Sequence, residues 1–307
     1  MSRYIINRLG QALIVLFGVS IAVAAMTQLV PGDPALTILG DNASPEAIAT
    51  LRDEMGLDDP FLVQYGRFVD RLVTEGSLGR SVRTNREVVD ELADRLPYTL
   101  TLAFGAVAIS TAIGIASGVL AAVRRGKPTD TIILVGTTLG LSVPSFWVAL
   151  LMVLLFSVKL GWLPVAGAGS WKHAVMPLIV LAIPSVATKS RLTRSAMLES
   201  LGQDYIRTAR AKGLQQRSVV FTHALRNALL PVLTIIGLQF GALLGGAFIT
   251  EVIFGWPGVG QLAVNSILQR DFPVVQGTVL LVTVAYVLTN LIVDLMYAWI
   301  DPRIRYQ

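Results

Sequence analysis

Six long apolar runs dominate the sequence, and each is at least as long as the roughly 20 residues that a helix needs to cross a bilayer. The runs are Leu9–Leu29, Pro97–Val123, Thr131–Val158, His173–Ala196, Ala228–Ile253 and Val274–Ile300. The chain is 53% hydrophobic and 15% charged, whereas globular chains carry about 25% charged residues. We therefore predict an all-α integral membrane protein with about six transmembrane helices, forming a single domain over residues 1–307.

The first apolar run has a second interpretation, because Arg3 and Arg8 precede it as basic residues precede the apolar region of a signal peptide. The run is longer than such a region usually is, and it lacks a convincing cleavage site made of small residues. We therefore expect an uncleaved span.

Charge is distributed unevenly between the two sides of the predicted spans. The N-terminus, the loop after span two, the region around spans four to five (from Lys189 onward) and the C-terminus hold 15 Lys and Arg against 4 Asp and Glu. The opposite side holds 10 Lys and Arg against 15 Asp and Glu. Short basic loops, such as Arg124–Lys127 here, remain in the cytoplasm. A multi-pass protein with both termini in the cytoplasm is predicted.

A polar segment over residues 31–96 separates the first two spans. Ser44 is placed as an N-cap, with Pro45 at the first position of a helix. Apolar residues recur at helical spacing after Pro45 and again from Pro60 to Thr74. We expect two or three short helices on the outer side of the membrane domain.

A polar, basic stretch from Gln203 to Pro231 separates spans four and five. Its first part has the spacing of an amphipathic helix, with Tyr205, Ile206 and Ala209 on one face. Gly213 follows where a helix end favours a residue of positive φ. A second helical run is expected over Ser218–Asn227, before Pro231 opens span five. The stretch is interpreted either as a helix that docks into a partner or as a basic loop or helix on anionic lipid.

Few residues inside the spans point to chemistry. Gly237, Gly241 and Gly245 form a face of small residues in span five, which fits either bundle packing or contact with a partner. Asp294 lies in span six near its cytoplasmic end, where a structural ion pair with Lys or Arg is favoured over a functional site. Pro144, Pro177 and Pro184 are expected to kink spans three and four.

Enzyme signatures are missing. The chain has no cysteine, two histidines outside any metal motif, and no phosphate-binding loop. Uphill transport would need energy from an ion gradient or from another polypeptide. Ion-coupled carriers usually contain inverted repeats and charged relay groups inside the membrane, and this sequence shows neither convincingly. Such a carrier remains the alternative, with Asp294 as its coupling site. An intramembrane enzyme has no supporting group of residues. We expect no metal and no cofactor in this chain.

The stretch DYIRTARAKGL, followed by HALRNALLP, resembles the cytoplasmic coupling motif of permease subunits of bacterial ATP-binding-cassette importers. The match is to the dipeptide, oligopeptide and nickel branch of this family. Further stretches fit that branch along nearly the whole chain: Leu29–Pro34, Met55–Tyr65, Glu251–Leu262 and Asp294–Tyr306. Ser157–Trp171 is similar to the outer loop of glutathione and dipeptide permeases.

The resemblance implies the fold of a type I importer and a division of labour in the bacterial inner membrane. A second related permease subunit completes the path, two cytoplasmic ATPases bind ATP and magnesium, and an extracytoplasmic binding protein delivers a peptide or peptide-like solute. Nucleic acid is not an expected partner. The exact substrate and the identity of the second permease are left open.

The resemblance also assigns roles to residues. The coupling region spans residues 203–227, and its ATPase contacts are expected at Asp204, Tyr205, Arg207, Thr208, Ala209, Ala211, Lys212, Gly213, Leu214, His223, Arg226 and Asn227. The wider superfamily carries Glu-Ala-Ala six to four residues before the glycine, where this chain has Arg207, Thr208 and Ala209. A glutamate-mediated ion pair with the ATPase is therefore in doubt. Related second subunits tend to carry proline where Arg226 stands.

Two further groups of residues are candidates. The path or the contact with the partner permease is expected to involve spans three and five, through Pro144, Phe146, Gln239, Gly241 and Gly245. An outer loop containing Phe254, Trp256 and Pro257 is expected to face the binding protein. Trp256 as an interfacial aromatic anchor is the alternative.

Overall fold

The computed structural model describes residues 2–29, 34–40 and 43–300, and these residues form helices and connecting loops with no strand. The chain divides into two compact units, Met1–Thr99 with Pro257–Gln307 and Leu100–Trp256. Five helices are long and apolar enough to cross a membrane, or six if the bent pair Pro128–Ser142 and Ser145–Lys159 is one span. The all-α prediction with about six spans is confirmed. The matched stretch after Ile300 and most of Leu29–Pro34 lie outside the described residues.

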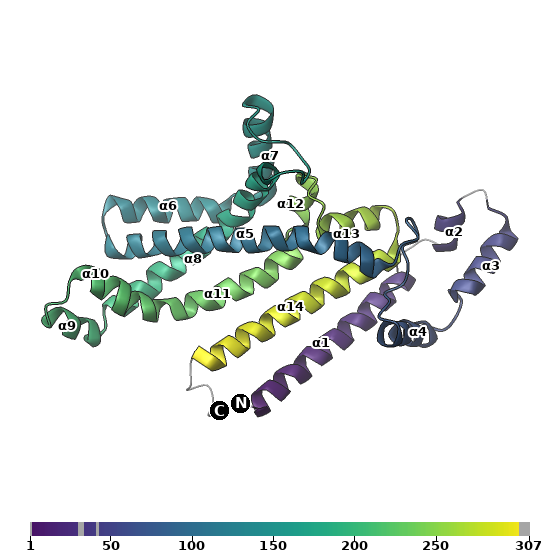
Figure 1. Ribbon diagram of the computed structural model, residues 1–307, viewed down its shortest axis with the longest axis horizontal. Coiled ribbons are helices and arrows are strands. Elements are labelled where there is room, and N and C mark those ends of the chain that lie inside the picture. Colours follow the sequence, from purple (N-terminus) through teal and green to yellow (C-terminus); the bar gives the residue numbers. More distant parts are fainter. Residues whose placement is uncertain (1, 30–33, 41–42, 301–307) are drawn as a thin grey trace. The chain divides into compact units, whose positions relative to one another are not determined.

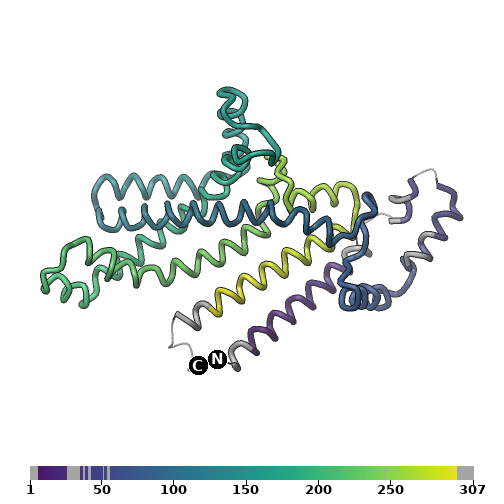
Figure 2. Tube along the Cα trace, in the orientation of Figure 1, coloured from purple at the N-terminus to yellow at the C-terminus, as the bar shows by residue number. Residues whose placement is uncertain are grey.

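The first unit is built around two long helices that lie side by side (Figures 1 and 2). Its helices are α1 (Ser2–Leu29), α2 (Pro34–Leu39), α3 (Pro45–Met55), α4 (Phe61–Thr74), the start of α5 (Val88–Val123), α13 (Val259–Leu268) and α14 (Phe272–Ile300). Val23, Phe68 and Leu280 form a buried cluster among α1, α4 and α14. Near the other end of the pair, the Arg8 guanidinium lies 3.1 Å from the Asp294 carboxylate. This ion pair supports the structural interpretation of Asp294, although the cation comes from α1 rather than from a loop.

The polar segment after α1 forms three short helices, as expected. The Ser44 hydroxyl accepts a hydrogen bond from the Ala47 backbone at 3.2 Å, which confirms Ser44 as the N-cap of α3. Gly56 ends this helix at a φ of +61°. The Tyr65 hydroxyl of α4 lies 2.8 Å from the Ser20 hydroxyl of α1, so the segment is fastened to the first span.

The second unit contains the remaining spans and the helices that connect them. These are the rest of α5, α6 (Pro128–Ser142), α7 (Ser145–Met152), η1 (Val153–Lys159), α8 (Trp171–Leu201), α9 (Asp204–Ala211), α10 (Gln216–Ser218), η2 (Val219–Ala224), α11 (Leu225–Gly246) and α12 (Phe248–Ile253). In Figure 1, α5, α6, α8 and α11 run alongside one another, and α9 lies at the end of α8. The helix α8 continues without interruption through Pro177 and Pro184.

The third predicted span is broken rather than kinked. The helix α6 ends at Ser142, and α7 begins at Ser145 with a change of direction of 98°. Pro144 has no backbone N–H, and it forces the preceding Val143 into extended backbone, with a ψ of 125°. The predicted continuous helix over Thr131–Val158 is therefore wrong at this position. The second half continues into η1, whose i to i+5 bonding marks it as a π-helix.

The fifth predicted span also has different limits. A continuous helical run passes from α10 through η2 into α11, so Pro231 lies inside a helix instead of beginning one. Membrane helices tolerate such a proline when neighbouring groups satisfy the freed backbone carbonyl. The run ends at Gly246, and α12 is a separate short helix. The predicted helical run over Ser218–Asn227 is confirmed, whereas the predictions that Pro231 opens the next segment and that one span reaches Ile253 are wrong.

Two glycines allow α5 to approach α8 closely. A Cβ atom added at Gly114 would lie 2.7 Å from Cβ of Lys189, and one added at Gly118 would lie 2.6 Å from the Ser190 carbonyl oxygen. Real Cβ atoms do not approach backbone this closely, so the contact depends on glycine. Small residues bring membrane helices together in this way. This glycine pair was not singled out in the sequence.

Replacing Gly118 with Ala is expected to lower the apparent Tm of the detergent-solubilised protein, because the added methyl group pushes α8 away from α5. Overpacking of this kind typically costs about 1–3 kcal/mol. Gly136→Ala in α6 is the control, since nothing lies within 4 Å of a Cβ atom there. Equal thermal stability of the two variants would show that this helix contact is loose.

Candidate coupling surface

The helix α9 is short, and it exposes most of its residues. Only Ile206 and Ala209 are buried, at 0% and 6% exposed. Tyr205, which the sequence analysis placed on the same face, is 40% exposed, and its hydroxyl forms hydrogen bonds. That oxygen lies 2.6 Å from the Ser200 hydroxyl and accepts a hydrogen bond from the Asn227 amide at 2.9 Å. Tyr205 thus ties the start of α9 to α8 and α11.

The end of α9 has the geometry that the sequence predicted. Gly213 takes a φ of +76°, and its N–H donates to the Arg210 carbonyl at 2.9 Å. The Leu214 N–H then donates to the Ala209 carbonyl at 3.3 Å. No atom lies within 4 Å of a Cβ atom added at Gly213. Residue type at this position is therefore restricted by the left-handed backbone conformation and not by contact of a side chain with neighbouring atoms.

The outward side of α9 and the turn after it are polar and mostly basic. We name this set of exposed residues the coupling surface: Asp204, Arg207, Thr208, Arg210, Ala211, Lys212, Gly213 and Leu214. Asp204 and Arg207 form an ion pair at 3.1 Å in which both side chains are more than three-quarters exposed. Such a pair contributes little to stability, so the charges of the coupling surface remain available to a partner.

The inward side of α9 rests on an apolar cluster, which we name the α9 seat. Besides Ile206 and Ala209 it consists of Val119, Ala122, Met197, Val219, Val220, Ala224 and Ala228. These residues come from the ends of α5 and α8, from η2 and from the start of α11. Because interiors are close-packed, a displacement of α9 must also displace the ends of these helices.

The other predicted coupling residues lie just after α9 on the continuous run into α11. His223 is half-buried in the π-helical stretch η2, while Arg226 and Asn227 are exposed. Asn227 is connected to α9 through Tyr205. Short π-helical stretches in helices are often found at functional sites. The structure therefore brings Asn227 to α9, whereas the exposed Arg226 side chain has no hydrogen bond or ion pair with another described residue.

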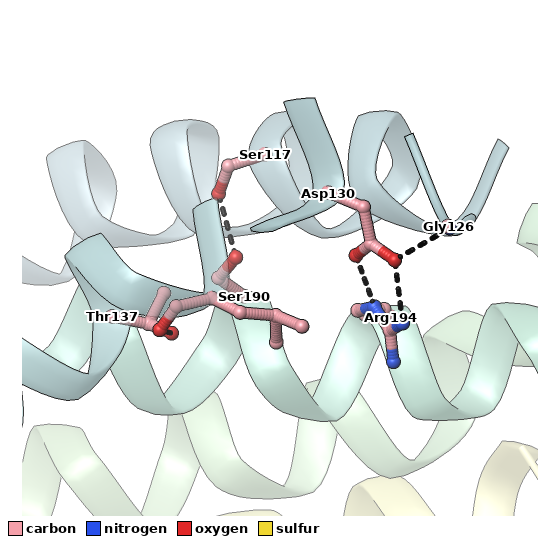
Figure 3. Close-up of polar contacts among 7 residues, drawn as sticks. Ser117, Gly126, Asp130, Thr137, Ser190 and Arg194 are labelled. Carbon is pink, nitrogen blue, oxygen red and sulfur yellow. Dashed lines mark hydrogen bonds and ion pairs between the residues drawn. The ribbon is translucent and has the colours of Figure 1, made fainter. Parts of the chain in front are cut away.

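A charged contact joins α6 to α8 close to this region. The Arg194 guanidinium binds both oxygens of the Asp130 carboxylate, at 2.7 and 2.8 Å (Figure 3). Asp130 also accepts a hydrogen bond at 3.0 Å from the backbone of Gly126, in the loop between α5 and α6. Two parallel N–H···O bonds fix the orientation of both partners. Sequence reasoning missed this pair, although Asp130 is the only carboxylate of a short basic loop.

Further polar contacts join α5 to α8. The Ser117 hydroxyl donates to the Ser190 hydroxyl at 2.9 Å, as Figure 3 shows. The Lys189 ammonium, which is fully buried, donates to the Ser110 hydroxyl at 2.6 Å. No carboxylate of the described residues lies within ion-pair distance of this ammonium group. Buried charge inside a membrane bundle is expensive and uncommon. The sequence analysis did not single out Lys189, although it lies within the predicted span His173–Ala196.

The predicted outer aromatic loop does not expose its aromatic side chains. Phe254 is 1% exposed and packs with Ala149, Met176 and Val180, and Trp256 is 4% exposed within another cluster of the second unit. The Phe254 carbonyl accepts a hydrogen bond from Gly167 at 2.9 Å. The burial of Trp256 does not fit the alternative of an interfacial anchor, and a loop that faces the binding protein stays a prediction, made without free aromatic side chains at Phe254 and Trp256. Pro257 belongs to the first unit and is half-buried.

The candidates for the path are placed on two elements. Pro144 caps α7 at the break, and the Phe146 side chain is 49% exposed beside it. Gln239, Gly241 and Gly245 lie in α11. The buried side-chain oxygen of Gln239 has no hydrogen-bond partner among the described residues. Thr111, Thr193 and Asn290 each have a buried side-chain oxygen of the same kind, so this feature does not distinguish Gln239.

Asp130→Asn is expected to lower the apparent Tm of the purified protein by several degrees, because the Arg194 charge then loses its counter-charge. Asp204→Asn is the matched control, since it removes the exposed pair with Arg207 and should leave the apparent Tm nearly unchanged. Thermal unfolding in detergent measures both variants. Equal effects of the two substitutions would contradict a structural role for the Asp130–Arg194 pair.

Two solved structures share this fold. A chain of the MetNI methionine ABC transporter in inward-facing conformations superposes with a TM-score of 0.57 at 18% identity, covering 68% of this chain and 96% of that one. An amino acid ABC transporter solved with histidines gives a TM-score of 0.56 at 19% identity, covering 68% and 93%. These likenesses establish the fold of ABC-transporter membrane subunits.

Sequence comparisons cover the whole chain. The glutathione transport system permease protein GsiC of Escherichia coli O6:H1 is 42% identical over 307 residues, which is 100% of both chains. A putative peptide transport system permease protein of Brucella abortus is 46% identical over 314 positions, again 100% of both chains.

Family descriptions match nearly all of the sequence. The binding-protein-dependent transport system inner membrane component matches residues 114–306, and the N-terminal part of such membrane components matches residues 1–103. The chain therefore belongs to the family of inner membrane components of binding-protein-dependent transport systems, and it is a multi-pass membrane subunit of an ABC importer.

Proposed function

We propose that this subunit forms half of a translocation path for peptides or peptide-like solutes and that separate ATPase subunits drive it through the coupling surface. The names of the two relatives support the solute class, since one transports glutathione and the other is a putative peptide permease. The single observation that carries the mechanism is the α9 seat, because it joins an exposed docking helix to the ends of several spans.

The coupling surface suits a cleft in an ATPase subunit. It presents Arg207, Arg210 and Lys212 against a single carboxylate, Asp204, so the complementary cleft is acidic. Leu214 adds an exposed apolar side chain at the turn. ATP and magnesium bind to the ATPase subunits, which close on ATP and pull on the docked helix.

Movement passes from α9 into the membrane through packed side chains. The α9 seat carries it to α5, α8 and α11, and the Asp130–Arg194 pair carries it from α8 to α6. Packed interfaces change between discrete arrangements rather than deforming continuously. A docked ATPase selects one arrangement only if its contacts with α9 differ between the two states.

A second permease subunit completes the path on the side of the broken span. The segment from α7 through η1 carries many exposed apolar side chains, among them Phe146, Trp147, Leu150 and Leu154. Exposed apolar surface on this scale marks contact with lipid or protein. The extracytoplasmic binding protein delivers the solute from the opposite end.

Sidedness follows from the basic loops. Arg124–Lys127, the coupling surface and both termini are cytoplasmic, because these regions carry the excess of Lys and Arg. The ion pair between Arg8 and Asp294 supports a common side for the start of α1 and the end of α14. The subunit lies in the inner membrane with α2, α3 and α4 on its extracytoplasmic side.

Gly213→Val is expected to reduce solute uptake by roughly tenfold or more while the protein still inserts into the membrane. A β-branched residue at a φ of +76° costs about 1–3 kcal/mol, which displaces the coupling surface. Gly213→Asn is the matched control, because asparagine tolerates this conformation. Uptake by reconstituted vesicles measures both variants, and wild-type uptake by Gly213→Val would refute the role of this turn.

A further inference from the structure

A polar cavity of about 570 Å³ lies in the first unit, outside the coupling surface. It is bounded by the loop before α5, the first turns of α5 and the helix α13. The residues that line it are Ser81, Arg83, Thr84, Arg86, Glu91, Asp94, Arg95, Tyr98, Pro257, Leu262, Asn265, Ser266, Gln269 and Asp271. Its volume is typical of sites for small molecules.

The carboxylates of this cavity all have partners within its wall. Asp271 is 3% exposed and accepts hydrogen bonds from the Ser81 hydroxyl and from the backbone of Val82 and Arg83. The Thr84 hydroxyl donates to Glu91. These bonds hold the loop before α5 in place, so this wall of the cavity is formed before any ligand arrives.

Two of the three arginines are also engaged. Arg83 donates twice to the Gln269 carbonyl, at 3.2 and 3.1 Å. Arg86 donates to Asp94 at 2.8 Å, and this hydrogen bond and charge raise the pKa of Arg86. Each of these guanidinium groups is thereby committed to a position in the wall.

Arg95 is different from the other two arginines. It is half-buried, it lines the cavity from α5, and no carboxylate of the described residues lies within ion-pair distance of its guanidinium. The exposed amide of Asn265 lines the same cavity from α13. The lining carries three arginines and three carboxylates, so its formal charge is balanced, and Arg95 is the arginine whose guanidinium has no hydrogen bond or ion pair to another described residue, beside the neutral donor Asn265.

We propose that this cavity binds a small carboxylate-bearing solute, with Arg95 forming two parallel hydrogen bonds to the carboxylate and Asn265 assisting it. A guanidinium group matches the planar geometry of a carboxylate. The concave shape and the volume of the cavity fit a molecule of the size of a short peptide. This inference rests on the proposed function, and it places a site that binds the solute carboxylate at the outer end of the subunit.

The test uses the assembled importer in lipid nanodiscs without its binding protein. The probe is radiolabelled trialanine, and the matched probe is trialanine amide, which lacks the carboxylate. Arg95→Gln is expected to weaken trialanine binding by roughly tenfold or more, as expected for a lost charge-assisted pair. Trialanine amide is expected to bind the wild type about as weakly as trialanine binds Arg95→Gln. Arg80→Gln is the control, because Arg80 pairs with Glu87 and neither lines the cavity.

Equal binding of trialanine and its amide to the wild type would overturn the proposal, as would unchanged binding after Arg95→Gln. If the importer does not assemble with Arg95→Gln, the binding of trialanine and of trialanine amide is compared on the wild type and on Arg95→Lys, and this comparison decides the proposal. Stimulation of ATPase activity by the loaded binding protein is measured in the same nanodiscs. Its absence in the wild type would count against the proposed function, whereas its presence without carboxylate-dependent binding would count against the cavity alone.

Discussion

The burial of Ile206 and Ala209 in the α9 seat is the interaction on which the rest of the account depends. An eight-residue helix has little stability of its own in water, because nucleating a helix is unfavourable. The seat holds it in one orientation, and the hydrogen bonds of Tyr205 to α8 and α11 fix its start. The polar side of α9 therefore faces outward from a rigid base, and force applied there reaches the membrane helices.

The bilayer explains where the helices break. Backbone groups in hydrocarbon must be paired within the chain, so a break is tolerated only where protein or water satisfies the freed groups. The breaks at Pro144 and at Ala247 both occur in the second unit, next to residues that the sequence associated with the path. The π-helical stretches η1 and η2 are further irregularities, and η2 lies between the coupling surface and α11. Irregular backbone and the residues proposed for the path thus occur in the same elements.

The sequence predicted what depends on composition and local conformation. Apolar runs marked the spans, Ser44 marked a helix start, and Gly213 marked the turn after α9, because each follows from neighbouring residues. Contacts between residues far apart in the sequence could not be predicted in this way. The pairing of Asp130 with Arg194, the burial of Lys189 against Ser110 and the fastening of Ser81 to Asp271 depend on how helices pack.

Errors in the prediction have the same origin. Phe254 and Trp256 lie in a stretch that reads as a loop, yet packing buries both side chains. Pro231 reads as a helix start, yet the helix continues through it. In both cases tertiary contacts override a local signal. The resemblance to importer permeases was informative because it compares whole chains, and it correctly indicated the family even where single elements were misplaced.

The most direct test of the central claim is to purify the C-terminally tagged subunit from its native membrane and to identify the chains that accompany it. The account predicts that two ATPase chains and a second permease copurify with the wild type. Reversing the charge of Arg207 and Arg210 together should remove the ATPases and keep the second permease, while Arg71→Glu on α4 should change neither. ATPases that remain bound after the charge reversal, or a wild-type subunit recovered alone, would contradict it.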